Sequence, residues 1–158
     1  MLFRSSASIL CSILPDVDVI AFWFDIPYGA FWGHRGFTHS LAFAAIISTA
    51  VIAYFSKEFE QPMRRKPQLF LYFFALTASH GVLDGMTDGG LGVAFFSPFD
   101  TMRYFLPWRP IPVSPIGMSF FSRWGLEVLM AEIVWIWSIC VVVWTVQRIY
   151  CRRANRSA

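Results

Sequence analysis

His34-Arg35-Gly36-Phe37-Thr38-His39-Ser40 places two imidazoles, a guanidinium and two hydroxyls within seven residues, at the start of a long apolar run. That run, residues 37–55, contains no Asp, Glu, Lys or Arg. A membrane-spanning helix needs about 20 mostly apolar residues, so the run predicts a span. Ionisable side chains at the mouth of such a helix are costly unless they have a function. The stretch therefore predicts a functional site at the start of a membrane helix.

The composition places the whole chain in a membrane. Of its 158 residues, 56% are hydrophobic and 15% are charged, and the mean hydropathy is +0.53. A soluble domain usually has about 25% charged residues. We therefore expect an all-α integral membrane helical bundle. No nucleic-acid-binding motif is present, and the basic residues gather at 57–66 and 148–156, where they bear on topology.

The hydropathy pattern predicts about four hydrophobic helices, at residues 2–14, 37–55, 69–83 and 125–146. The first is short for a full span, and Pro15 is expected to end it. The aromatic residues of 19–32 are expected to form an interfacial loop, and 93–123 a longer interfacial loop without helical periodicity. We expect residues 1–147 to form a single membrane-embedded domain, followed by a basic cytoplasmic tail, 148–158.

Because consecutive spans run in opposite directions, the predicted helices bring distant polar residues to one end of the bundle. This end collects Asp16, Asp18, His34, His39, His80, Asp84, Asp88, Glu127 and Glu132. It includes all three histidines of the chain. The opposite end collects most of the lysines and arginines, so the positive-inside rule places that end in the cytoplasm and the polar cluster on the periplasmic or exterior side.

The polar cluster has the composition of a metal site. His80 and Asp84 are four residues apart and so share one helical face. A set of imidazoles and carboxylates without thiolate suits Zn²⁺, Mn²⁺ or Fe²⁺, in a catalytic rather than a structural site. Simpler roles stay open for single residues: His39 and His80 as hydrogen-bonding groups between helices, Asp16 as a helix cap, and Asp88 as a turn residue.

The chemistry that follows from such a site is metal-assisted hydrolysis, in which a spare carboxylate acts as general base. Arg35, Arg103 or Arg109 could hold an anionic group, since guanidinium matches phosphate. Arg35 could equally anchor to lipid headgroups. We take Asp18, Arg35 and Asp88 as the catalytic candidates. A site at headgroup level favours a lipid-like or membrane-near substrate, so we expect membrane lipids as partners, with the substrate and the oligomeric state open.

Three spaced motifs resemble those of one known family. They are Leu14-Pro15-Asp16-Val17-Asp18, the stretch 34–40, and His80-Gly81-Val82-Leu83-Asp84, followed by Arg103-Tyr104-Phe105-Leu106-Pro107-Trp108-Arg109-Pro110-Ile111. Together they resemble the YdjM-like (DUF457) family of bacterial inner-membrane proteins, whose members are described as membrane-bound, metal-dependent hydrolases. That family is distantly similar to zinc-dependent phospholipase C and related nucleases, which implies phosphodiester hydrolysis by analogy.

The resemblance implies a bacterial inner-membrane location, zinc as the metal, and a set of ligands matched residue by residue. These ligands are Asp16, Asp18, His34, His39, His80, Asp84 and Glu132. Family members usually carry a further helix ahead of the Pro-Asp-x-Asp motif, where this chain has 14 residues. Two other functions stay open: a metal-ion or solute-binding transporter or sensor without hydrolysis, and a structural protein whose polar residues join helices.

Overall fold

A computed structural model describes residues 2–58, 65–115 and 117–154 of the chain. In these ranges the regular structure is helical, apart from isolated bridge residues, among them the pair Val93 and Tyr104. The prediction of an all-α fold is therefore confirmed. The chain divides into two compact units, Met1–Trp108 and Arg109–Ala158, which are described separately below. The assignment of 1–147 to a single domain stays a prediction.

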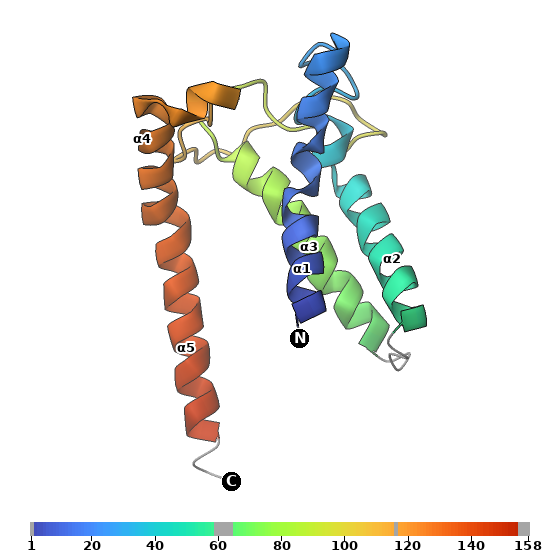
Figure 1. Ribbon diagram of the computed structural model, residues 1–158, viewed down its shortest axis with the longest axis vertical. Helices are drawn as coiled ribbons and strands as arrows, with labels where there is room; N and C mark the ends of the chain where they lie inside the picture. The colour runs from blue at the N-terminus through green and yellow to red at the C-terminus, as the bar shows by residue number, and fades with distance from the viewer. Residues whose placement is uncertain (1, 59–64, 116, 155–158) are drawn as a thin grey trace. The chain divides into compact units, whose positions relative to one another are not determined.

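The first unit is built around helix α3 (Lys66–Gly85), which packs against both α1 (Leu2–Ile13) and α2 (Leu41–Glu58) (Figure 1). Two shorter elements complete it: the 3-10 helix η1 (Leu14–Phe24), which continues from α1, and the single turn η2 (Phe37–His39), which precedes α2. Consecutive helices run in opposite directions, so the end of α1, the start of α2 and the end of α3 lie together (Figure 1).

Small side chains let these helices approach closely. Ala44 and Ser48 on α2 and Thr77 on α3 are buried. Ala7 and Cys11 of α1 are also buried, and they form the core of the unit with Phe73 of α3. Interfaces of this kind are typical of helices that associate in a bilayer, where close van der Waals packing replaces the hydrophobic effect.

The first helical segment is longer than predicted. The α-helix ends at Ile13, just ahead of Pro15, as expected. The chain then continues as the 3-10 helix η1 to Phe24, so the prediction of a loop is wrong for residues 19–24. Proline is tolerated in the first turn of a helix because the N–H that it lacks would have no partner there. Together the two segments form a 19-residue apolar stretch, Ser6–Phe24, long enough to cross a membrane.

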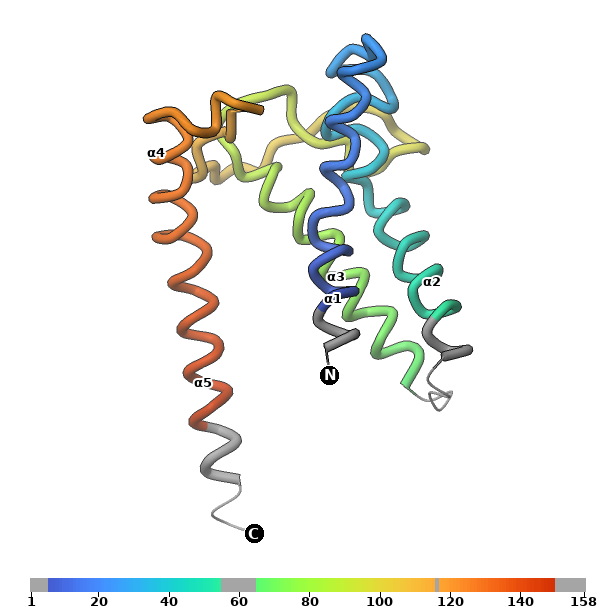
Figure 2. Tube along the Cα trace, viewed as in Figure 1, coloured from blue at the N-terminus to red at the C-terminus, as the bar shows by residue number. Residues whose placement is uncertain are grey.

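Two loops lie on the side of the first unit where η1 ends and α2 begins (Figure 2). The first, 25–36, begins at Asp25, whose left-handed backbone ends η1. The second, 86–108, contains no helix, in agreement with the prediction for its part from residue 93. Backbone hydrogen bonds join this loop to two helices: Leu106 N donates to Gly85 O at the end of α3 (2.8 Å), and Leu41 N at the start of α2 donates to Phe95 O (3.0 Å).

The second unit is a helical segment that runs from α4 (Arg123–Glu132) through the π-helical turn η5 (Ile133–Trp137) into α5 (Ser138–Ala154). It contains the predicted span 125–146, and its residues Arg123–Ile149 are long and apolar enough to cross a membrane. The 3-10 turn η4 (Gly117–Phe121) precedes it, so the last part of the predicted long loop is helical.

Two of the helical stretches described above are therefore candidate spans, and α2 contributes a shorter apolar stretch, Leu41–Tyr54. That residues 37–55 and 69–83 also cross the membrane stays a prediction. Residues 155–158, part of the predicted basic tail, lie outside the described residues.

Candidate metal centre

Four side chains from three separate segments meet at the junction of α1, α2 and α3. Asp16 lies at the start of η1, His39 ends η2, and His80 and Asp84 occupy the last two turns of α3. One nitrogen or oxygen of each lies within 4.8 Å of the others. The shortest contacts are 3.0 Å from His39 Nε2 to Asp84 Oδ2 and 3.2 Å from His80 Nε2 to Asp16 Oδ1. Convergence of these four residues was predicted from the alternating helix directions.

Hydrogen bonds on the far side of each imidazole determine what its Nε2 can do. His80 Nδ1 lies 2.8 Å from the Ser12 carbonyl oxygen, which can only accept, so this nitrogen carries the proton. His39 Nδ1 lies 3.0 Å from Asp18 Oδ2, which likewise favours a proton on Nδ1. In a neutral imidazole the other nitrogen then has a free lone pair. Ligating histidines in metal sites are commonly held in this way, through a carbonyl or carboxylate behind the ring.

With these tautomers, the unprotonated Nε2 of His39 faces a carboxylate oxygen of Asp84, so two hydrogen-bond acceptors face each other. His39 Nε2 and Asp84 Oδ2 are buried and have no hydrogen-bond partner within the described residues, although they lie 3.0 Å apart. The Arg35 guanidinium lies 2.9 Å from Oδ1 of Asp84 and not between these two atoms, so the lone pairs of Nε2 and Oδ2 still repel each other unless a cation or a proton lies between them. Either a metal ion or an additional proton on each ring supplies that positive charge, and because the two compete, metal binding at such a site releases protons. The donor set and its orphaned atoms therefore fit a divalent cation.

Asp18 stands behind His39. Its side chain is 1% exposed, and its two oxygens accept hydrogen bonds from His34 Nδ1 (2.7 Å), Arg35 N (3.1 Å) and the Thr38 hydroxyl (2.5 Å). With these donors and His39 Nδ1 around it, this carboxylate resembles the second layer of a metal site, which orients a ligating ring.

A second group of possible ligands overlaps with the first. Asp18, His34 and His39 also bring their ligand atoms within 4.8 Å of one another. This group uses His39 Nδ1, whereas the four-residue group uses Nε2. A neutral imidazole offers only one lone pair, so it cannot serve both groups at once. Direct ligation by Asp18 and His34 stays a prediction.

Arg35 contacts both Asp18 and Asp84. Its backbone N–H donates to Asp18, while its guanidinium Nη2 lies 2.9 Å from Asp84 Oδ1 and its Nη1 donates to the Thr87 hydroxyl at 2.8 Å. To do both, the residue adopts a left-handed backbone with φ of 61°. This conformation costs a non-glycine residue roughly 1–3 kcal/mol and is concentrated at functional sites. The side chain is 4% exposed, so it faces Asp84 rather than solvent.

Glycines on α3 allow His39 to approach. A Cβ built on Gly81 would lie 2.7 Å from the His39 carbonyl oxygen, and one on Gly85 would lie 3.0 Å from the Phe95 ring. A side chain at position 81 would therefore separate η2 from α3. Since His80 and Asp84 are on the same helix, the glycine also sets the distance from these two residues to His39.

Arg103 fastens the loop that carries His34. Its guanidinium donates to the carbonyl oxygens of Tyr28 (2.8 Å), His34 (2.9 Å) and Ala30 (3.2 Å). The sequence marked Arg103 only as one of several possible anion-binding arginines. Its partners are backbone atoms of a loop 69 to 75 residues away in the chain, and no side-chain pattern could have revealed them.

Asp88 and Glu132 are not among the grouped ligand atoms of the described residues. Asp88 is exposed, beyond the end of α3. Glu132 is half-buried in the second unit. The catalytic role of Asp88 and the ligand role of Glu132 stay predictions.

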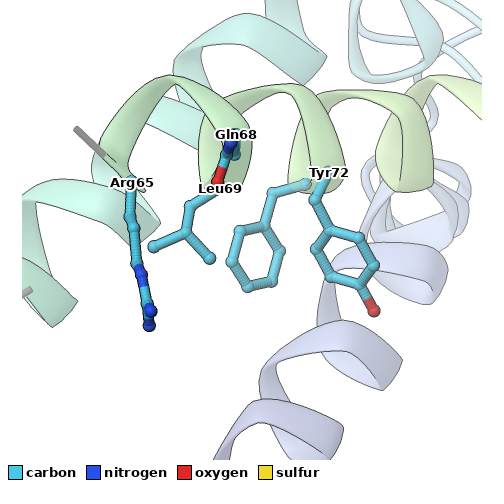
Figure 3. A pocket seen from close by; sticks show the side chains of 5 residues that line it. Arg65, Gln68, Leu69 and Tyr72 are labelled. Atoms are coloured by element: carbon cyan, nitrogen blue, oxygen red, sulfur yellow. The ribbon is translucent and has the colours of Figure 1, made fainter. Parts of the chain in front are cut away.

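A cavity of about 580 Å³ lies elsewhere in the first unit, on the first turns of α3 (Figure 3). It is lined by Arg65, Gln68, Leu69, Tyr72 and Phe73. None of the four clustered residues lines it, and His80 follows Phe73, the last lining residue, by seven residues, a rise of about 10 Å along an α-helix. The cavity is therefore separate from the candidate metal centre.

Comparison with known proteins identifies relatives over nearly the whole chain. A family model described as YdjM inner membrane protein matches residues 4–154. The inner membrane protein YbcI of Escherichia coli (strain K12) is 36% identical over 132 residues, which are 83% of this chain and 75% of that protein. No solved structure matches the chain significantly.

Proposed function

The chain belongs to the YdjM family of inner membrane proteins, and we propose that it is a membrane-bound, metal-dependent hydrolase. Its metal ligands in this proposal are Asp16, His39, His80 and Asp84. The observation that carries the proposal is the pair of buried, unpartnered acceptors His39 Nε2 and Asp84 Oδ2, 3.0 Å apart. Arg35 compensates the charge of Asp84 at Oδ1 only, so a cation or a proton is still needed between Nε2 and Oδ2.

The ligand set favours zinc, with manganese or iron as alternatives. Two imidazole nitrogens and two carboxylate oxygens form an all-N/O set of intermediate softness. A divalent metal in such a set supplies Lewis acidity and lowers the pKa of bound water toward neutrality. Oxygen-only ligand sets are preferred by Mg²⁺ and Ca²⁺, so the two histidines argue against these ions.

The burial of the four side chains gives the site a closed and an open side. The side chain of His39 is fully buried and those of His80 and Asp84 are 20% and 19% exposed, whereas that of Asp16 is 49% exposed. A substrate would therefore approach past Asp16. This carboxylate contacts the two histidines through Oδ1, and its other oxygen is the best placed general base for a water molecule at the open side.

Two further residues position the ligands in this proposal. Asp18 holds His39 in the tautomer with a free Nε2, and Arg35 occupies Oδ1 of Asp84, so that Oδ2 is left for the metal. Arg35 is thus a positioning residue rather than a group that binds the substrate. The substrate class that fits best is a phosphodiester or another lipid-like molecule, because the site lies where the helix ends of an inner membrane protein meet.

An activity assay tests this function. The purified protein in detergent, reconstituted with zinc, is incubated with a chromogenic phosphodiester and with phospholipids. We expect turnover that is abolished by a chelator and by Asp16→Asn, but retained in Ser79→Ala, an exposed position on α3. Metal that binds in stoichiometric amounts without turnover of any phosphodiester or lipid ester would refute hydrolysis and favour an ion-binding membrane protein.

A further inference from the structure

A smaller cavity is lined in part by the loop that carries His34 and Arg35. Its volume is about 180 Å³, and its walls come from both loops of the first unit. Gly29 and Gly36 contribute from the first loop, and Ala94, Ser97 and Arg103 contribute from the second. None of the four proposed metal ligands lines it. It is therefore a space distinct from the metal centre.

Ser97 supplies an unsatisfied hydroxyl in this cavity wall. The residue is 1% exposed, and its Oγ has no hydrogen-bond partner within the described residues. A buried hydroxyl without a partner costs roughly 1–3 kcal/mol, so nearly all such groups in native proteins are paired. The backbone N–H of the same residue is already bonded to Ala94 O. The side chain is thus held in the wall with a donor still to be satisfied.

Arg103 supplies positive charge to the same cavity. Its guanidinium contacts only backbone carbonyls and the face of Tyr28, and no carboxylate of the described residues forms an ion pair with it. Asp100, the nearest acidic residue in the sequence, is bonded instead to the Tyr104 hydroxyl and to Met102 N. No Asp or Glu lines the cavity. Its electrostatic character is therefore positive.

We propose that this cavity binds a phosphoryl group, through the hydroxyls of Ser97 and Thr101 and the charge of Arg103. A phosphate has several acceptor oxygens, which match the two hydroxyl donors, and a negative charge, which matches the positive charge of Arg103; both Nη atoms of Arg103 already donate to backbone carbonyls. The space admits a phosphate with a few further atoms. The phosphoryl group can come from a lipid headgroup or from a small soluble phosphate, and the chemistry of recognition is the same for both.

The site goes beyond the proposed hydrolase function, because its ligand does not have to be the substrate. The residues that line the cavity are nevertheless hydrogen-bonded to the loop that carries His34 and Arg35. Ala94 N donates to Arg35 O at 3.1 Å, and Arg103 donates to His34 O. An occupant would therefore contact residues that are hydrogen-bonded to the backbone of His34 and Arg35.

Phosphate binding to the metal-free protein tests the proposal without reference to the metal centre. The chelator-treated protein in a neutral detergent is titrated with inorganic phosphate and followed by calorimetry. Ser97→Ala removes one donor while keeping the fold of the loop, and Thr101→Val removes the other. Ser79→Ala, which removes an exposed hydroxyl on α3, is the matched control.

We expect saturable binding that is weakened about tenfold by each of the two cavity variants, the effect of one lost hydrogen bond to a charged group, and unchanged in the control. Binding that does not saturate, or that is equal in the Ser97→Ala and Ser79→Ala proteins, would overturn the proposal. A repeat in nanodiscs containing phosphatidylglycerol separates the sources. If lipid phosphate occupies the cavity, free phosphate no longer binds there; if a soluble phosphate is the ligand, binding is retained.

Discussion

Gly81→Ala should weaken metal binding although the residue contacts no metal. An alanine Cβ at this position would lie 2.7 Å from the His39 carbonyl oxygen, about 0.7 Å inside the 3.4 Å at which ordinary contact begins. The obstructing atom is backbone, so η2 or α3 has to move. A shift of this size exceeds the tolerance of roughly 0.5 Å within which a site holds its geometry. His39 would then be carried away from His80 and Asp84.

The effect on folding stability has two opposing parts. Glycine to alanine inside a helix favours the helix by about 1 kcal/mol, while overpacking costs typically 1–3 kcal/mol. We therefore expect little change or a modest fall in melting temperature, but a loss of zinc affinity of about 10- to 100-fold, the usual effect of displacing a ligand's support.

Zinc affinity is measured by competition with a chromophoric chelator in detergent, beside Ser79→Ala on the same helix. The control exchanges an exposed side chain for alanine, so it tests helix propensity without the collision. A Gly81→Ala protein that melts higher than the wild type and binds zinc equally well would refute the close approach of η2 and α3.

Three further predictions concern residues of the first unit. Asp18→Asn should reduce zinc affinity about 10- to 100-fold in the same competition assay, because its amide no longer favours a proton on His39 Nδ1; unchanged affinity would contradict its orienting role. Arg35→Met should lower stability by roughly 1–3 kcal/mol in chemical unfolding of the metal-free protein, because Asp84 loses the guanidinium at Oδ1 and keeps only the His39 imidazole at Oδ2; a variant as stable as the wild type would disprove this. Hydrogen bonds from the Tyr104 hydroxyl, and then from the Met102 N–H, hold the pKa of Asp100 below its usual range. The ionised Asp100 therefore stabilises the fold at pH values above the ordinary carboxyl pKa, and this contribution is lost as the pH falls. Tyr104→Phe should raise the pKa of Asp100 in a carboxyl NMR titration, and an unchanged pKa would exclude the hydrogen bond.

The positions of the four proposed ligands could be predicted because they depend on regular features. His80 and Asp84 share a face through their spacing of four, and His39 stands at the start of an apolar run. Alternating helix directions then place them together with Asp16. None of these steps needs knowledge of a loop conformation.

The supporting contacts could not be predicted, since they depend on backbone geometry. The contact of Arg35 with Asp84 depends on the left-handed backbone of Arg35, which no sequence pattern indicated; its role toward a lipid or a substrate stays a prediction. Arg103 bonds to carbonyl groups, which every residue type carries. The extension of the first helical segment past Pro15 was missed for a related reason: a proline that ends one helix can begin the next.

The metal content of the purified protein tests the central claim most directly. The protein is isolated in detergent, reconstituted with zinc, manganese or iron in turn, and desalted before elemental analysis, beside the His80→Ala/Asp84→Ala double variant. We predict about one tightly bound ion per chain in the wild type, with zinc retained best, and almost none in a folded double variant. No bound metal in the wild type with any of the three ions, or equal amounts in both proteins, would contradict the metal centre.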